Sequence, residues 1–268
     1  MDVNISFADG AIAAAVTENG IGWLTINRPE KRNALTDAMW RAVPETFNWL
    51  VSQQHARVVV IRGAGDRDFS AGADIGEFET LRKDAETARS YEAGNSEAFA
   101  AVRNCPVPVI AAMRGICFGG GFGLAAAADI RLADDTARFA IPAARLGLAY
   151  PPDAVQDLVR ALGDQQARHA LFSTLELSVE QAVACGCLLK LCRPGQLDAN
   201  VLSLATSIAE AAPLSVRASK AAILALHSGS REDYDHASAL AEATFDSQDY
   251  AEGRRSFMQK RKPAFEGK

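Results

Sequence analysis

Two wholly apolar runs, each followed at once by a glycine-rich segment, are the features that most restrict the fold of this chain. The runs cover residues 58–61 (VVVI) and 107–113 (VPVIAAM), and the glycine-rich segments after them cover residues 63–72 and 115–123. Uninterrupted apolar runs with many β-branched residues are typical of strands that are buried on both faces, as in a parallel sheet. The sequence therefore predicts an α/β protein in which buried strands lead into glycine loops.

The rest of the chain extends this α/β interpretation. Pro29 ends a predicted first strand at residues 20–27, and Thr36 is a good N-cap for a helix that contains Pro44 and runs toward residue 54. Further predicted elements are helices at 84–103 and 124–128 and short strands at 130–133, 138–141 and 188–191. From residue 152 onward the pattern is mostly helical. We therefore expect an α/β core at residues 1–196 and a helical C-terminal lobe at residues 197–268.

Composition argues against several classes of partner. The 268 residues are 49% apolar and carry a formal net charge of -5, which leaves no general basic surface for nucleic acid or an anionic membrane. The first ten residues lack the pattern of a secretory leader, and no uninterrupted apolar stretch of about 18 residues occurs. We therefore expect a cytoplasmic protein.

The five cysteines and four histidines favour no metal centre. Cys185, Cys187 and Cys192 are clustered, and a redox or metal site is the alternative to a role as small buried hydrophobic residues. No CxxC pair, no histidine at zinc-finger spacing and no HExxH motif accompanies them. The sequence therefore predicts no metal.

The two glycine-rich segments contain FSAGADI (residues 69–75) and GICFGGGFG (residues 115–123). Consecutive glycines let backbone N–H groups approach a ligand with no Cβ in the way, and a helix start adds unpaired donors, which together suit an oxyanion. A dinucleotide site is the alternative, because Gly121, Gly123 and Ala126 fit GxGxxA. However, residues 114–120 separate the strand from that motif, and no carboxylate follows about 20 residues later. A GxSxG nucleophile elbow is absent.

Through most of its length the chain resembles the crotonase (enoyl-CoA hydratase/isomerase) superfamily, from NRPEKRNAL (residues 27–35), through SAGAD and the triple glycine, to FMQKRKPAF (residues 257–265). The resemblance implies a crotonase-like spiral of ββα units, a helical C-terminal trimerisation lobe, and homotrimers or dimers of trimers. It also implies an acyl thioester of coenzyme A as the substrate, with no permanently bound cofactor. The amides of Ala73 and Gly120 would hold the thioester carbonyl.

The same resemblance implies coenzyme A contacts at Arg28, Arg32, Ala34, Ala71, Asp74, Ile75, Phe257 and Lys260. Clustered cations support part of this set, since residues 28–32 and 260–262 hold six Lys or Arg side chains in an acidic protein. For residues 260–262 alone, cations that match the dipole of a solvated helix end are the alternative.

Two positions depart from the family pattern. Family hydratases carry one glutamate after the triple glycine and another in the motif FxxPE, and these positions are Gly123 and Ala143 in this chain. Hydration of an enoyl thioester needs two carboxylates around one water. Ordinary hydratase chemistry is therefore not expected, and standard isomerisation, which uses the second carboxylate, loses support as well.

Tyr150 and Asp153 are the proton-active side chains near these positions. Tyr150 falls where methylmalonyl-CoA decarboxylases carry a tyrosine, and loss of carbon dioxide would form an enolate without a base. This likeness is partial, because those enzymes have a histidine at the position of Ala73 and a threonine at that of Pro142. Alternatively, Tyr150 closes the acyl pocket and Asp153 begins a helix. A non-catalytic acyl-CoA-binding protein is the alternative of a different class.

Overall fold

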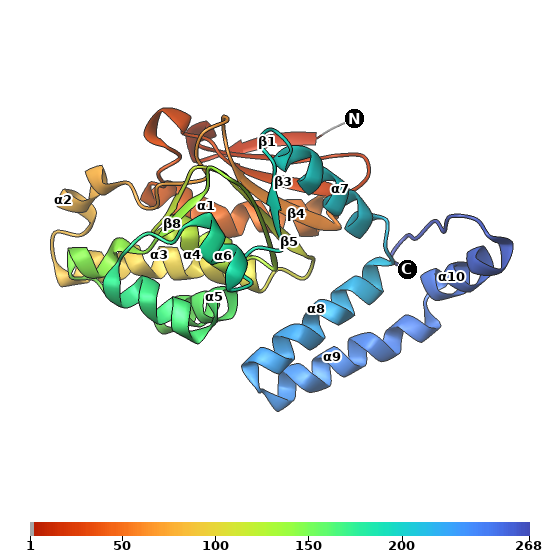
Figure 1. The fold of residues 1–268 in the computed structure, drawn as a ribbon. Coiled ribbons are helices and arrows are strands. Elements are labelled where there is room, and N and C mark those ends of the chain that lie inside the picture. The colour runs from red at the N-terminus through yellow and green to blue at the C-terminus, as the bar shows by residue number, and fades with distance from the viewer. Residues whose placement is uncertain (1–2) are drawn as a thin grey trace.

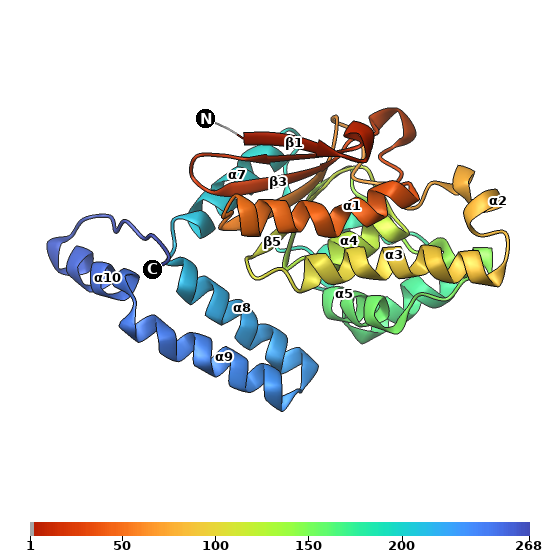
Figure 2. The same cartoon turned by 180° about the vertical axis from the view of Figure 1, so that it is seen from behind.

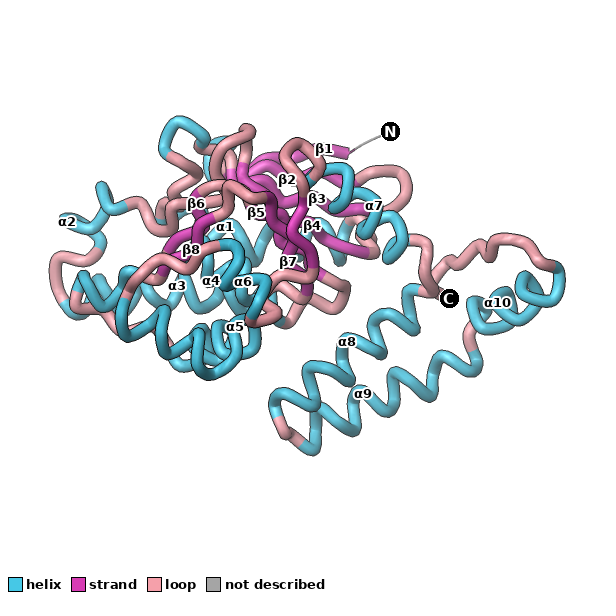
Figure 3. The backbone as a smooth tube through the Cα atoms, viewed as in Figure 1, coloured by secondary structure: helices cyan, strands magenta, loops and turns pink. Residues whose placement is uncertain are grey.

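The computed structural model describes residues 3–268, and the centre of this part of the chain is a seven-stranded sheet in the order β1-β2-β3-β4-β5-β7-β9 (Figure 3). Its strands are β1 (Val3–Phe7), β2 (Ile12–Val16), β3 (Ile21–Ile26), β4 (Val58–Gly63), β5 (Val109–Met113), β7 (Ile130–Asp134) and β9 (Lys190–Cys192). The first three strands pair antiparallel, and all later pairs are parallel. A separate parallel pair joins β6 (Ile116–Phe118) to β8 (Arg138–Ala140).

The predicted α/β class is confirmed, and β4 shows why the apolar run identifies it. Val59 and Ile61 belong to the core on one face of the sheet, whereas Val58 and Val60 belong to the core on the other face. All four side chains have 0% exposure. Because successive side chains of a strand point to opposite faces, a strand buried on both sides needs an apolar residue at every position.

Three strands are not predicted by the sequence. The predicted first strand at residues 20–27 is β3, and β1 and β2 precede it. β1 is an edge strand with mostly exposed side chains, and the sequence of β2, IAAAV, is rich in alanine, which forms strands poorly. β6 lies inside the second glycine-rich segment, so its three residues read as loop.

Helices cover both faces of the sheet (Figures 1 and 2). They are α1 (Asp37–Asn48), α2 (Phe78–Leu81), α3 (Ala85–Arg103), α4 (Gly120–Ala127), α5 (Pro152–Ser173), α6 (Val179–Ala184), α7 (Leu197–Ala209), α8 (Pro213–Ser228), α9 (Arg231–Ala243) and α10 (Gln248–Gln259). The predicted helices near residues 36–54 and 84–103 correspond to α1, with the π-helical turn after it, and to α3. By contrast, α4 begins at Gly120, within the triple glycine, and not at residue 124 as predicted.

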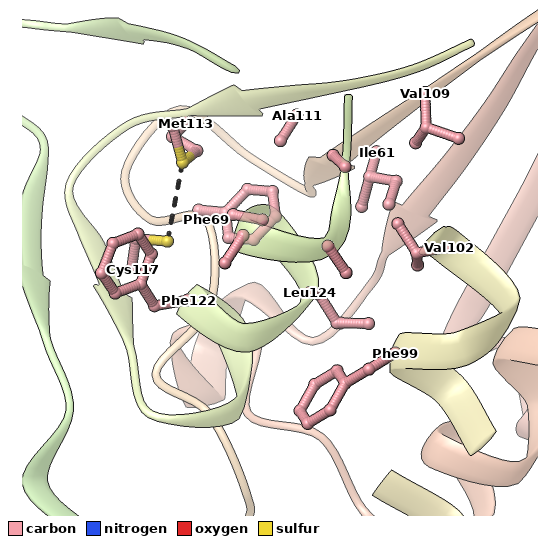
Figure 4. Packing of buried hydrophobic residues seen from close by; sticks show 14 of the residues in the cluster. Ile61, Phe69, Phe99, Val102, Val109, Ala111, Met113, Cys117, Phe122 and Leu124 are labelled. Carbon is pink, nitrogen blue, oxygen red and sulfur yellow. Dashed lines mark hydrogen bonds between the residues drawn. The ribbon is translucent and has the colours of Figure 1, made fainter. Parts of the chain in front are cut away.

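The core beneath the glycine-rich segments is made of apolar and sulfur-containing side chains (Figure 4). Cys117 and Met113 have their sulfur atoms 3.7 Å apart, and both side chains have 0% exposure. Burial raises the pKa of the Cys105 and Cys187 thiols to about 11, which keeps them protonated and unreactive at neutral pH. Among residues 3–268, no group of three or more His, Cys, Asp or Glu side chains is placed to hold a metal ion.

The last part of the chain stands away from the core (Figures 1 and 2). α7 packs on the sheet through Leu197, Val201 and Ala205, so the predicted boundary near residue 197 falls at a helix of the core, and the projecting part begins with α8 at Pro213. Large apolar side chains exposed on this part are Ile223, Leu226, Phe245, Phe257 and Met258. No single described helix is long and apolar enough to cross a membrane; α7 and α8 meet that criterion only as a pair, which is bent by 105°.

Candidate functional site

The two glycine-rich segments meet in the structure. The Ser70 N–H donates to the Ile116 carbonyl, and the Phe118 N–H donates to the Ser70 carbonyl, both at 2.9 Å. These bonds hold residues 70–73 against β6 and the beginning of α4. Gly72 has a φ of +89°, and a Cβ there would lie 2.7 Å from the Phe118 carbonyl oxygen. The close approach of the two segments therefore requires glycine at this position.

Two backbone N–H groups at this junction have no acceptor among residues 3–268. Leu35 donates to the Gly72 carbonyl and accepts from the Asp74 N–H, both at 2.8 Å, and this parallel bridge leaves out the N–H of Ala73. Gly120 is the first residue of α4, where a helix offers its own N–H groups no acceptor. Within the described chain neither N–H donates a hydrogen bond, and both residues line one cavity of about 110 Å³. The structure thus brings together the two amides predicted to act as a pair.

Two parts of the cavity lining differ in character. The first, here called the glycine wall, consists of residues 71–73 and 119–120 and presents backbone. The second, here called the α3 wall, consists of Arg82, Glu92, Asn95 and Phe99 and presents side chains. Two preorganised amides beside the positive end of a helix favour an oxygen atom that develops negative charge. The volume is well below the roughly 300–1,000 Å³ of sites for drug-sized ligands, so the cavity fits a short group.

Phe99 fills the space next to Gly123. A Cβ at Gly123 would lie 2.6 Å from Phe99 Cζ, well inside contact distance. The Phe99 ring is held in turn by an edge-on contact with Trp40, with ring centres 5.8 Å apart. The other position without the expected glutamate, Ala143, lines the cavity. A side chain at residue 123 would therefore require Phe99 to move, whereas residue 143 already faces the cavity.

Tyr150 lines the same cavity. The hydroxyl oxygen is buried and has no hydrogen-bond partner within residues 3–268. Burial raises the pKa of Tyr150 well above its usual value, and the charge of Glu92 raises it further. The hydroxyl is therefore neutral at physiological pH, so it can donate a hydrogen bond or a proton but is not a base.

Asp153 is the other predicted proton-active side chain, and it does not line this cavity. It lies in the first turn of α5, and its carboxylate contacts Arg103 at 3.2 Å. The same guanidinium binds Asp157 at 2.8 Å through a carboxylate that is only 3% exposed. This position agrees with the alternative considered for Asp153, a carboxylate at the beginning of a helix.

Six of the predicted coenzyme A contacts lie close to the glycine wall. Arg28 binds the Asp74 carboxylate and the Ala34 carbonyl, each at 2.9 Å, and the Ala71 N–H donates to the Arg32 carbonyl at 2.9 Å. The Arg28 guanidinium lowers the pKa of Asp74 by hydrogen bonding to it. Ile75, the sixth residue, is 73% exposed and also lines the cavity. The structure therefore gathers Arg28, Arg32, Ala34, Ala71, Asp74 and Ile75.

The two remaining predicted contacts, Phe257 and Lys260, are not brought to this place. Both lie at the end of α10, and in Figures 1 and 2 α10 is at the opposite end of the molecule from α2, whose residue Phe78 lines the cavity. Phe257 is 86% exposed. In a single chain the last helix does not reach the site, because α8 and α9 carry α10 away from the core, and the contact of Phe257 and Lys260 with coenzyme A stays a prediction.

Comparison with known proteins assigns the chain to a family. The model of the enoyl-CoA hydratase/isomerase family matches residues 16–268. A crystal structure of an enoyl-CoA hydratase/isomerase family protein from Hyphomonas neptunium superimposes with a TM-score of 0.91, at 32% identity, covering 96% of this chain and 98% of that one. This chain belongs to the enoyl-CoA hydratase/isomerase family. The predicted membership of the crotonase superfamily and the predicted crotonase-like fold are thereby confirmed.

Relatives within this family of CoA-thioester-processing enzymes differ in the reaction that they catalyse. Crotonyl-CoA hydratase of Syntrophomonas wolfei is 32% identical over 92% of this chain and 95% of its own length. Methylmalonyl-CoA decarboxylase of Escherichia coli is 27% identical over 94% of this chain and 97% of its own length. The enoyl-CoA hydratase/isomerase family thus includes both a water-adding and a decarboxylating enzyme at similar distance from this chain.

The side chains of the α3 wall are the part of the site that the sequence does not predict. Glu92, Asn95 and Phe99 share one face of α3, at positions i, i+3 and i+7. Glu92 and Asn95 are polar residues on a helix face that also holds the buried aromatic residues Tyr91 and Phe99. Polar residues on such a face are a weak sequence signal of a cavity. Arg82 follows α2 and gives no periodic signal.

Proposed function

We propose that this protein binds a short acyl-CoA thioester and stabilises its enolate with the amides of Ala73 and Gly120. The observation that carries the proposal is the pair of unpartnered N–H groups lining one small cavity. In a site that excludes water, two such donors stabilise a developing oxyanion strongly, and losing one donor typically costs about 2.7–4 kcal/mol of barrier. Coenzyme A itself belongs to the substrate in this proposal, and no permanent cofactor is needed.

Further residues fit defined roles in this proposal. Arg28 and Arg32 supply cations for the phosphate groups of coenzyme A, next to Ala34, Ala71, Asp74 and Ile75. Tyr150 lines the cavity with a neutral hydroxyl, since burial keeps it protonated, and this hydroxyl can form a hydrogen bond with a polar group of the acyl chain. Asp153 has no role in the reaction, because Arg103 and the first turn of α5 account for its position.

We also propose that the protein is a homotrimer or a dimer of trimers, with α8–α10 as the contact region. The exposed apolar side chains of these helices support this arrangement, because monomers seldom leave many large apolar groups in water. Phe257 and Lys260 would then contact coenzyme A bound to a neighbouring copy. Sedimentation of the purified chain tests the arrangement, and a monomer at micromolar concentration would contradict it.

Decarboxylation is the second candidate reaction. The observation in its favour is that residue 123 is a glycine with Phe99 packed beside it and so offers no carboxylate, and loss of carbon dioxide needs no base to form the enolate. The similarity to a methylmalonyl-CoA decarboxylase supports it further. Ordinary hydration has less support, because it needs two carboxylates around one water.

The deciding experiment is mass spectrometry of a panel of enoyl-, 3-enoyl- and 2-carboxyacyl-CoA thioesters after incubation with the protein. Chromatography of the same samples detects shifts of the double bond, and calorimetry measures binding in parallel. Turnover of any member supports enolate chemistry, and loss of carbon dioxide selects the second candidate. Tight binding with no change in any thioester would show a non-catalytic acyl-CoA-binding protein.

A further inference from the structure

The α3 wall contains charged and polar side chains that the proposed enolate chemistry does not use. Arg82 forms an ion pair with Glu92 at 2.7 Å. Its guanidinium carbon lies 4.2 Å from the ring centre of Phe78 and 4.3 Å from that of Tyr91. The two rings and the carboxylate hold the guanidinium in one orientation.

Three polar atoms of the cavity have no hydrogen-bond partner within residues 3–268. They are Arg82 Nε, Asn95 Oδ1 and the Tyr150 hydroxyl oxygen, and all three are buried. The Arg82 side chain is 9% exposed and Asn95 is 6% exposed. An unsatisfied buried polar group costs about 1–3 kcal/mol, so three of them around one cavity indicate that the cavity receives a polar group.

Glu92 fixes the orientation of the Asn95 amide. Asn95 Nδ2 donates to Glu92 Oε2 at 3.3 Å. Because a carboxylate only accepts, the amide nitrogen must face Glu92, and Oδ1 is left as a free acceptor. The Arg82 Nε–H is a free donor, and the Tyr150 hydroxyl can act either way. The ion pair of Arg82 and Glu92 leaves this set without net charge.

The polar set lies away from the oxyanion donors. Phe99 Cζ would be 4.0 Å from a Cβ at Gly120, so Phe99 is the part of α3 next to the glycine wall. Asn95 and Glu92 precede Phe99 by one and two helical turns, about 6 and 10 Å along the helix at 1.5 Å per residue. A group bound by this set belongs to the far end of a short acyl chain and not to the reacting carbons.

A hydroxyl group matches the free atoms better than the alternatives. It donates to Asn95 Oδ1 and accepts from Arg82 Nε or Tyr150. A carboxylate offers acceptors alone and would face both Oδ1 and the charge of Glu92, and a methyl group would satisfy none of the three atoms. We propose that Arg82, Asn95 and Tyr150 form a subsite for a hydroxyl group at the fourth carbon or beyond of a short acyl-CoA. This proposal rests on the proposed acyl-CoA site.

The test compares the binding of three thioesters to the full-length protein by calorimetry. 4-Hydroxybutyryl-CoA and pentanoyl-CoA differ only by a hydroxyl in place of a methyl group, and succinyl-CoA carries a carboxylate at the same place. We expect 4-hydroxybutyryl-CoA to bind at least tenfold more tightly than the other two. Equal affinity for 4-hydroxybutyryl-CoA and pentanoyl-CoA, which is expected if the cavity only holds water, overturns the subsite. A preference for succinyl-CoA overturns it as well. Failure of all three to bind overturns the acyl-CoA site as well.

Two variants identify the atoms responsible. Asn95→Leu removes the acceptor at nearly constant volume. Tyr150→Phe removes a hydroxyl that no atom of residues 3–268 uses, so the second variant keeps the test valid if the first one fails to fold. Each should reduce the hydroxyl preference about tenfold while leaving pentanoyl-CoA affinity unchanged or higher. Arg89→Met, on the exposed side of the same helix, is the matched control and should keep the full preference. A preference that survives in both Asn95→Leu and Tyr150→Phe overturns the assignment.

Discussion

The two walls of the cavity obtain their chemistry in different ways. The glycine wall presents backbone amides to the cavity. Its chemistry depends on glycines that let the two segments approach and on a hydrogen-bond pattern that leaves the N–H groups of Ala73 and Gly120 without an acceptor among residues 3–268. The α3 wall works through side chains that are held by one another, as Arg82 is by Glu92 and two aromatic rings. The glycine wall therefore depends on the course of the backbone, whereas the α3 wall depends on the identity of the side chains that face the cavity.

The largest effect is expected where Phe99 of the α3 wall packs against α4. Gly123→Glu places a Cβ 2.6 Å from Phe99 Cζ and a carboxylate at a buried position. We expect the free energy of unfolding to fall by about 3–5 kcal/mol, measured by urea denaturation. Phe99→Ala should allow the glutamate more room, so the double variant should be more stable than Gly123→Glu alone.

A comparison of residues 123 and 143 distinguishes a position that has a side chain packed against it from a position that faces the cavity. The control is Ala143→Glu, because residue 143 already lines the cavity and its glutamate should be tolerated with a loss below about 1 kcal/mol. Wild-type stability of Gly123→Glu would show that Phe99 moves easily and that the walls are not in firm contact.

The glycine wall alone is tested by Ala73→Pro. Proline deletes the N–H of residue 73 without breaking any hydrogen bond of the described chain, and the residue before it is Gly72, which tolerates the restriction that proline imposes. We expect kcat/KM for the substrate found in the thioester panel to fall by about 10²–10³. Affinity for free coenzyme A, measured by calorimetry, should stay the same. Unchanged turnover in the folded variant would remove Ala73 from the mechanism.

The difference between the walls also explains what the sequence predicts. Glycines in a fixed order after buried strands identify the glycine wall, because few structures need them, and the apolar runs identify the sheet. Glu92 and Asn95 look like ordinary polar helix residues, since nothing local indicates that Phe99 and Tyr91 turn that face inward. Arg82 becomes part of the site only through packing between residues distant in sequence. The position of α10 in a single chain is unpredictable for the same reason, because the direction of the α8–α9 pair depends on contacts along its whole length.

The α3 wall is expected to depend on Arg82 for its own order. Arg82→Met keeps an unbranched side chain but removes the guanidinium that lies over the rings of Phe78 and Tyr91, and it leaves Glu92 without its cation. Since Glu92 is 33% exposed, water compensates in part, and we expect a loss of about 1–2 kcal/mol in the free energy of unfolding. The double variant with Glu92→Gln should recover part of this loss. If Arg82→Met is as stable as the wild type, the α3 wall is not held by the ion pair.

The smallest effect on stability is expected at the ion pair of Arg28 and Asp74, here called the rim of the glycine wall. The two side chains are 2.9 Å apart, and each is about one-fifth exposed. Arg28 lowers the pKa of Asp74 in the folded state, so the ion pair contributes its full stabilisation above the unfolded pKa of about 4. That contribution disappears as the pH falls through the lower, folded-state pKa. We expect Arg28→Met to cost about 0.5–1 kcal/mol at pH 7 and less below pH ~4, measured by urea denaturation at both pH values.

Asp74→Asn separates this charge effect from the rest of the rim. With no carboxylate to titrate at residue 74, the cost of adding Arg28→Met should be the same at both pH values. A cost that still shrinks on acidification in the Asp74→Asn background would mean that Arg28 acts through another carboxylate. The rim would then resemble the α3 wall, because several side chains would share one cation. Only the amides of Ala73 and Gly120 would then distinguish the glycine wall from the α3 wall.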